Sequence, residues 1–334
     1  QTPYRVSLFG GGTDYPAWYQ EHGGLTVGMA IDKYCYVSIA PAPPGQAKRY
    51  RVAYSQIEEA DVIDDLRHPG ARGVLSYRKV TAPVALGHMS DLLSGGGLGA
   101  SSAYVVGLLR AIEAFRGEAE TTPYELAEEA IHVERNVIEE AVGDQDQLFA
   151  AYGGLRYFKF AKEITVPAAL GHMDATPTFT TAPIALSSEL SPTLFDSLVL
   201  VHTGTTRYAH EMAAKVIEAI PDRQPQLHRL TALAKEGLGV LQHGTLTQLG
   251  ALLHSSWLLK RELHRELAPP IVDALYEHGL ACGAIGGKLL GAGGGGFMLF
   301  VVPPERRARF EQAISAPCVR FFGPAPHGCR VLDL

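Results

Sequence analysis

The sequence predicts a mixed chain of strands and helices that forms one large or two medium domains. Its 334 residues exceed the usual size of a single domain, and 46% are apolar, which is enough for a sizeable core. β-branched and aromatic residues alternate over residues 4–9 and 25–40, which predicts strands there. A glycine-rich loop then enters an apolar-periodic stretch from Ala100 to about Arg116, which predicts a helix that Gly117 ends.

The second half of the chain predicts a further unit. Leu198–Val201 has the pattern of a strand and is followed by helical sequence to about Ile220. The run Gly291–Gly296 leads into a strand from Phe297 to Val302. We place the domain boundary in the loop-rich stretch 175–195, which gives an N-terminal domain 1–185 and a C-terminal domain 186–334. Further helices are expected over 224–240, 245–260 and 268–279.

Composition narrows the classes of partner. The chain is mildly acidic, with a net charge of −6 and no basic cluster, which argues against a nucleic-acid or membrane-surface partner. No apolar run approaches the roughly 20 residues of a membrane span. The four scattered cysteines lack zinc or disulfide spacing, so we expect a protein of the reducing cytosol. The oligomeric state stays open, with a homodimer as one option.

The loop before the first long helix is expected to hold phosphates. Its glycines allow close approach to a polyanion, and the helix that follows directs its N–H groups and positive dipole end at the anion. A Walker loop is excluded because no lysine follows the last glycine, and a dinucleotide fold would need a strand after Gly117 that is absent. A ligand-free glycine turn stays open. The expected contacts are Gly95, Gly96, Gly97, Leu98, Gly99, Ala100, Ser101 and Ser102.

A second helix places a carboxylate toward the core. Thr122, Pro123 and Glu125 form a capping box, and the helix is expected to run to about Ala141. Glu134 falls within its apolar stripe, where a carboxylate needs a metal, a hydrogen-bond network, an arginine partner or a proton. The rest of that stripe is Leu126, Ala127, Ala130, Ile131, Val137, Ile138 and Ala141.

Two further segments carry polar residues that suit chemistry. Gly143–Gln147 is expected to be an acidic turn at the end of that helix, where the dipole disfavours Asp146 unless a function requires it; a solvated turn is the alternative. Near the N-terminus, Arg5 lies in a strand that leads to the loop Gly10–Asp14. An aspartate among glycines could accept hydroxyl hydrogen bonds from a sugar, while an Asx-turn is the alternative for Asp14.

Taken together, these segments resemble the GHMP kinase superfamily over the whole chain. Residues 5–15 look like its first motif, 97–103 like its phosphate loop and 291–296 like its glycine-rich third motif. Within the superfamily the pattern is most similar to the D-glycero-D-manno-heptose 7-phosphate kinases, which carry the features seen here at 10–14, 143–147 and 288–297. The resemblance implies an α+β fold with a ribosomal protein S5 domain 2-like N-terminal domain, a ferredoxin-like C-terminal domain and an active site in the cleft between them.

The resemblance also implies roles for individual residues. Asp146 matches the catalytic carboxylate and Arg5 its basic partner, while Ser101 and Glu134 match ligands of Mg²⁺, which accompanies ATP. Ala100 replaces a usual serine of the phosphate loop, so Ser102 could supply the missing hydroxyl. The residues expected to contact the sugar substrate are Gly11, Gly12, Thr13, Asp14, Gly153, Gly154, Arg207, Lys288, Gly293 and Gly294.

The expected reaction is phosphorylation of the anomeric hydroxyl of a heptose 7-phosphate by Mg·ATP. Gly11 and Gly12 stand where galactokinases carry bulkier, charged residues, which leaves room for a longer, phosphorylated sugar. Its phosphate needs a cation, and the candidates are Arg207, Lys288 and the pair Arg78 and Lys79. The alternatives are a GHMP kinase for galactose, L-fucose or a uronic acid, an inactive ATP or sugar sensor, and an NAD-dependent oxidoreductase.

Overall fold

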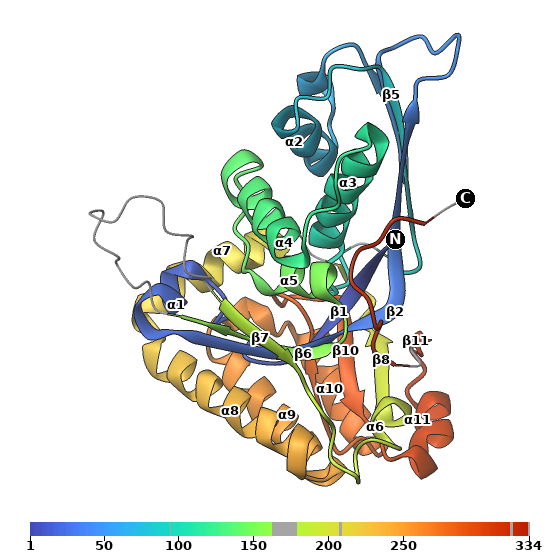
Figure 1. Ribbon diagram of the computed structural model, residues 1–334. Helices are drawn as coiled ribbons and strands as arrows, with labels where there is room; N and C mark the ends of the chain where they lie inside the picture. Colours follow the sequence, from blue (N-terminus) through green and yellow to red (C-terminus); the bar gives the residue numbers. More distant parts are fainter. Residues whose placement is uncertain (94, 162–178, 207–208, 321–322, 333–334) are drawn as a thin grey trace, which may run out of the picture. The chain divides into compact units, whose positions relative to one another are not determined.

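The computed structural model describes residues 1–93, 95–161, 179–206, 209–320 and 323–332 (Figure 1). Helices and strands are mixed, as predicted, and the chain divides into two compact units. The first unit contains residues 1–6 and 29–154 with the C-terminal segment described over 323–332; the second contains 7–28 and 155–320. The described helices include none that is long and apolar enough to cross a membrane.

The first unit is built on a sheet in which strands β4, β3, β5 and β2 follow one another, with β1 paired to β2. Strand β3 runs parallel to β5, whereas β2 is antiparallel to β5 and β3 to β4. The two predicted N-terminal strands are confirmed, and the unassigned stretch 46–90 supplies the others. The strands are β1 (Thr2–Phe9), β2 (Gly24–Pro41), β3 (Tyr50–Ala53), β4 (Ile57–Ala60) and β5 (Val84–Ser90).

Four α-helices accompany this sheet (Figure 1). The predicted bounds of α3 are confirmed, because glycines in the left-handed conformation, Gly99 and Gly117, stand at its two ends. Most side chains of α3 are buried, as expected for a helix that packs against α2, α4 and α5. The helices are α2 (Pro69–Tyr77), α3 (Ala100–Arg116), α4 (Pro123–His132) and α5 (Gln145–Tyr152), and a 3₁₀ turn covers Ile63–Asp65.

Helix α4 differs from its prediction at its C-terminal end. Its capping box of Thr122 and Glu125 is present, but the α-helix ends at His132 instead of near Ala141. A π-helical turn, Val133–Val137, follows, closed by a bond from the amide of Ile138 to the carbonyl of Val133. The wider turn rotates later residues off the predicted stripe, so Val137 is exposed at 36%, while Glu134 is fully buried as predicted.

The second unit holds an antiparallel four-stranded sheet in the order β11-β8-β10-β9, and it also holds β6 and its antiparallel partner β7. The predicted strands at 198–201 and 297–302 are confirmed, as are the three later helices. The strands are β6 (Leu155–Phe160), β7 (Phe179–Pro183), β8 (Leu198–His202), β9 (Gly286–Leu289), β10 (Phe297–Val301) and β11 (Cys318–Val319). The helices are α1 (Pro16–His22), α6 (Leu194–Ser197), α7 (Ala209–Ala219), α8 (Gln224–His243), α9 (Leu246–Arg261), α10 (Pro270–Ala281) and α11 (Arg307–Ala313), with 3₁₀ turns at Ile220–Asp222, Arg265–Leu267 and Pro304–Arg306.

This strand order confirms the predicted ferredoxin-like C-terminal domain, in which helices separate β8 from β9 and β10 from β11. Helix α9 lies directly on β9 because both carry glycine at the contact: a Cβ on Gly286 would stand 1.9 Å from the carbonyl oxygen of Gly250. Trp257, Tyr276 and Phe300 form the centre of the core between the sheet and helices α9 and α10. The third glycine motif, 291–296, connects β9 to β10 and is therefore fixed at both ends.

Candidate active site

The glycine loop before α3 has the backbone conformation that a phosphate cradle needs. Gly95, Gly97 and Gly99 all have positive φ, at 75°, 74° and 75°, which side chains with a Cβ rarely adopt. Leu98 between them is 2% exposed and anchors the loop, and its carbonyl accepts from the amide of Arg5. The N–H groups in the first turn of α3 have no carbonyl partner within the helix. They follow directly after this fixed loop, where an anion could accept their hydrogen bonds.

An arginine–aspartate pair lies against this loop. Arg5 donates from Nε and Nη2 to the two carboxylate oxygens of Asp146, both at 2.7 Å, and its Nη1 donates to the carbonyl of Gly97. A Cβ placed on Gly99 would stand 3.3 Å from Asp146 Oδ2, so the loop packs on the pair. Arg5 is 4% exposed and the Asp146 side chain 24%, which leaves the carboxylate accessible. A bidentate pair of this kind fixes the orientation of the carboxylate.

The position of Asp146 corrects one expectation. The segment 143–147 does not end the preceding helix; Asp146 lies in the first turn of α5. At a helix N-terminus the dipole stabilises a carboxylate, so the unfavourable placement expected from the sequence does not arise. Its neighbour Asp144 pairs with Arg135 instead and is buried.

Glu134 is a fully buried carboxylate. Ser102 Oγ donates to Glu134 Oε1 at 3.1 Å, and the side-chain amide of Gln147 donates from Nε2 to Glu134 Oε2. Burial raises the pKa of Glu134 from 4.5 to about 8, an effect that the two hydrogen bonds only partly oppose. Among the residues that the structure describes, no cationic side chain forms an ion pair with Glu134.

The donors around Glu134 fit a hard divalent cation. They are oxygens, one carboxylate and one hydroxyl, and Mg²⁺ takes one or two protein oxygens together with phosphates and water. In the described part of the chain no group of three or more His, Cys, Asp or Glu could hold a metal alone. The serine that contacts Glu134 is Ser102, at 2% exposure; Ser101 is exposed one position earlier on α3, and its role as a ligand stays a prediction.

The first glycine motif is tied to strand β2 within the second unit. Thr13 Oγ1 donates to the carbonyl of Gly10 at 2.8 Å and accepts from the amide of Leu25, so its hydroxyl fixes the loop. A Cβ at position 10 would lie 1.8 Å from the carbonyl oxygen of Leu25, so this position requires glycine. Asp14 accepts from the amide of Gly12, two residues before it, at 2.9 Å and is 2% exposed. This is not the Asx-turn that the sequence left open, which needs the amide two residues further on; that position is Pro16, which has no N–H.

The third glycine motif is held by backbone bonds. Gly296 donates to the Thr205 carbonyl, and the Gly294 amide donates to the carbonyl of Leu267. A Cβ on Gly293 would stand 2.6 Å from a Leu267 methyl group, at a φ of 115°. Lys288, on β9 three residues before this motif, is 3% exposed and donates from Nζ to the carbonyl of Leu8, which lies two residues before Gly10.

Three further residues were predicted to contact the substrate: Gly153, Gly154 and Arg207. Gly153 and Gly154 pack on the C-terminal segment: the Gly154 amide donates to Ala325, and a Cβ on Gly153 would stand 2.3 Å from the backbone of His327. Their contact with substrate stays a prediction. Arg207 lies outside the described residues.

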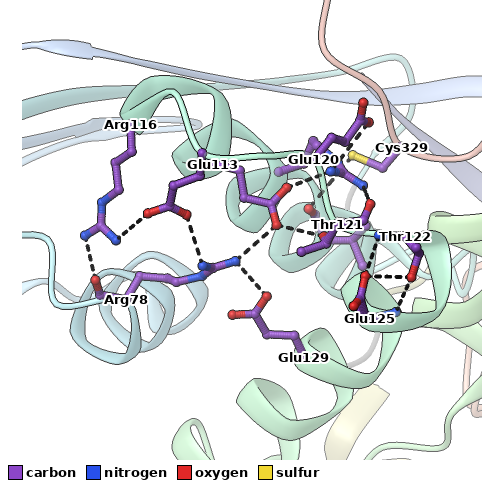
Figure 2. Close-up of polar contacts among 12 residues, drawn as sticks. Arg78, Glu113, Arg116, Glu120, Thr121, Thr122, Glu125, Glu129 and Cys329 are labelled. Carbon is purple, nitrogen blue, oxygen red and sulfur yellow. Dashed lines mark hydrogen bonds and ion pairs between the residues drawn. The ribbon is translucent and has the colours of Figure 1, made fainter.

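Arg78, a candidate for binding substrate phosphate, belongs to a buried ionic network (Figure 2). It pairs with Glu129 at 2.7 Å and with Glu113 at 3.3 Å, and Glu113 also pairs with Arg110 at 2.6 Å. These carboxylates occupy its guanidinium, so we assign Arg78 to the packing of α2 against α3 and α4. The network was not predicted. The spacing of three residues between Arg110 and Glu113 on one helix was a signal for their pair, whereas the contacts of Arg78 join segments far apart in the sequence.

Comparison with known proteins agrees with this geometry. The family model described as GHMP kinases N terminal domain matches residues 71–154, and the model described as GHMP kinases C terminal matches 234–320. A D-glycero-alpha-D-manno-heptose 7-phosphate kinase of Campylobacter jejuni is 26% identical over 94% of this chain and 92% of its own. A plant relative, the bifunctional fucokinase/GDP-fucose pyrophosphorylase of Arabidopsis thaliana, is 24% identical over 92% of this chain and 30% of its own.

Solved structures share the fold. A D-glycero-D-manno-heptose 1-phosphate kinase of Bacteroides thetaiotaomicron superposes with a TM-score of 0.73, at 22% identity over 99% of this chain and 98% of its own. A Lactococcus lactis galactokinase complexed with galactose gives a TM-score of 0.70, at 16% identity over 97% and 94%.

The two family models together match about half of the chain, which belongs to the GHMP kinases, a class of phosphotransferases. It is an ATP-dependent sugar kinase and is similar to heptose phosphate kinases. The predicted boundary at 185/186 lies between the two family-model matches and stays a prediction.

Proposed function

We propose that this chain transfers the γ-phosphoryl group of Mg·ATP to the anomeric C1 hydroxyl of D-glycero-D-manno-heptose 7-phosphate, which yields the 1,7-bisphosphate. The observation that carries the proposal is the bidentate Arg5–Asp146 pair packed on the glycine loop that precedes α3. It places a fixed, partly accessible carboxylate beside a loop suited to phosphates, as transfer to a hydroxyl requires.

In this mechanism each protein group has a separate task. Backbone amides of the loop 95–102 hold the phosphates, and Asp146 accepts the proton of the attacking hydroxyl. Arg5 orients Asp146 and adds positive charge beside the transferred group. Glu134, with Ser102 or Ser101, would hold Mg²⁺, which supplies positive charge that offsets the charge of the phosphates.

The sugar phosphate is proposed to contact the two glycine motifs of the second unit. Asp14 has a carboxylate suited to sugar hydroxyls, and Gly11 and Gly12 present no side chain to a long substrate. Lys288 is the proposed cation for the substrate phosphate because its buried ammonium lies on the strand that enters the third motif. Gly293 and Gly294 would contact the substrate through their backbone.

The proposal also specifies which hydroxyl of the sugar is phosphorylated. The relative from C. jejuni is a 7-phosphate kinase by name, whereas the structural neighbour is named a 1-phosphate kinase. The reaction at C1 is favoured because an anomeric hydroxyl is a comparatively acidic alcohol, which suits a carboxylate base. A kinase for L-fucose is the second candidate, favoured by the fucokinase relative.

An ADP-release assay with Mg·ATP and a panel of free and phosphorylated sugars tests the proposal, with ³¹P NMR of each product. We expect turnover with heptose 7-phosphate and a new anomeric phosphate signal. Turnover restricted to L-fucose or a free hexose would transfer the assignment to that sugar. Tight ATP binding without turnover on any sugar would instead indicate a sensor.

The role of Asp146 has its own test. Asp146→Asn should lower kcat by roughly 10²–10⁴-fold, because the proton acceptor is lost while the loop amides are unchanged. Asp144→Asn is the matched control, since Asp144 lies in the same turn but pairs with Arg135. If the kcat of the Asp146 variant lay within a few fold of that of the unaltered enzyme, Asp146 would not be the proton acceptor.

A further inference from the structure

The side chain of Gln147 is fully buried beside Glu134 and only partly satisfied. Its side-chain nitrogen donates to Glu134 Oε2, yet its side-chain oxygen Oε1 is enclosed and has no hydrogen-bond partner among the residues that the structure describes. A buried amide oxygen without a partner has lost its hydrogen bonds to water, so such groups in native proteins normally meet a ligand, an ion or a water molecule. The structure thus has a second acceptor oxygen next to the buried carboxylate.

Helix α5 connects this amide with the catalytic pair. Asp146 and Gln147 are consecutive residues in its first turn, so their side chains leave the helix about 100° apart. Asp146 reaches Arg5, whereas Gln147 reaches Glu134, which Ser102 contacts from α3. The helix therefore sets the spacing between the proton acceptor and the buried carboxylate.

We propose that Gln147 is a residue of the cation site, which rests on the proposed Mg·ATP-dependent function. Its N–H fixes the orientation of the Glu134 carboxylate, and its Oε1 supplies a further oxygen to the hydrated divalent cation. The chemistry agrees, because Mg²⁺ and Mn²⁺ prefer neutral and anionic oxygens and keep several water molecules. Gln147 is the last residue of the segment 143–147, in which the sequence pointed to Asp146 alone as a functional residue.

Binding of Mn²⁺ tests the proposal without reference to turnover. Free Mn²⁺ is measured by electron paramagnetic resonance while it is titrated into the enzyme with a non-hydrolysable ATP analogue. Gln147→Met removes both polar atoms at similar volume and should weaken Mn²⁺ binding 10- to 100-fold, as loss of groups that support a metal ligand does. Gln145→Met, the same change two residues earlier on α5, should leave the affinity within about threefold. Equal Mn²⁺ affinity in the Gln147 variant and the unaltered enzyme would overturn the proposal.

A measurement on the unaltered protein covers the case in which the variant does not fold. Enzyme labelled with ¹³C at the glutamine side-chain carbonyl should show a ¹³C coupling to bound Mn²⁺ in pulsed electron–nuclear spectra, and Gln145→Met should retain it. Absence of that coupling, with Mn²⁺ bound, would also overturn the proposal. If the unaltered enzyme binds neither Mn²⁺ nor the analogue, the proposed function itself fails, which separates the two results.

Discussion

Glu134 should make the nucleotide-free protein less stable as the pH rises, and Glu134→Gln should remove that loss. The carboxyl is fully buried, and within the described part of the chain it receives two hydrogen bonds, from Ser102 and Gln147. Burial raises its pKa from 4.5 to about 8. Between these values the folded chain retains a proton that the unfolded chain has released, so the stability contributed by this group is complete below pH 4.5 and is lost as the pH rises toward 8.

The magnitude follows from the two pKa values. One pH unit corresponds to about 1.4 kcal/mol, so the full difference from 4.5 to about 8 amounts to roughly 5 kcal/mol. About 4 kcal/mol of it falls between pH 5 and pH 9. Glutamine cannot ionise, and it keeps the shape of the side chain. The free energy of unfolding of Glu134→Gln relative to the unaltered protein should therefore increase by about 4 kcal/mol across this range.

Urea unfolding at pH 5, 6, 7, 8 and 9, with EDTA and without nucleotide, measures this difference. Glu139→Gln is the matched control, because Glu139 is exposed and its difference from the unaltered protein should stay flat. Mg·ATP should stabilise the unaltered protein more than Glu134→Gln, and more strongly at pH 8 than at pH 6, since a cation favours the ionised carboxylate. A difference between Glu134→Gln and the unaltered protein that varies by less than 1 kcal/mol from pH 5 to 9 would refute the reasoning.

Two further predictions concern stability and the phosphate loop. Glu113→Gln should cost about 3–5 kcal/mol in urea unfolding, because it removes charge that compensates the buried Arg110 and the partly buried Arg78. Lys48→Ala, at an exposed ion pair, should change the stability little. Equal effects of the two would contradict the assigned role of the network. Gly99→Ala should weaken ATP binding in calorimetry at least about tenfold, since its Cβ meets the Arg5–Asp146 pair at a φ of 75°. Gly117 is the control, because its φ of 65° gives a comparable backbone strain but a Cβ there would lie in open space. Gly117→Ala should therefore leave the ATP affinity unchanged. If it weakened ATP binding as much as Gly99→Ala, backbone strain alone would explain the loss at Gly99.

Local sequence signals predicted the longer helices and the strands β1, β2, β8 and β10, but not the other strands or the short helices. Helix α3 and the start of α4 were predicted closely because glycine and a capping box act within one turn of the chain. The π-helical turn at Val133–Val137 was missed, since apolar spacing assumes 3.6 residues per turn and tertiary contacts decided otherwise. The place of Asp146 was missed because the segment 143–147 was predicted to be a turn, whereas its last three residues begin α5.

The sequence by itself determined that a carboxylate would be buried at Glu134, because helical spacing alone puts it within an apolar stripe. It also determined the glycine loop, since positive φ angles require glycine whatever surrounds them. Only the tertiary structure decided which groups meet. Ser102 rather than Ser101 reaches Glu134, and Arg5 reaches Asp146 across 141 positions of sequence. The physical reason is that such contacts depend on how helices and strands pack, and one residue along a helix turns a side chain by about 100°.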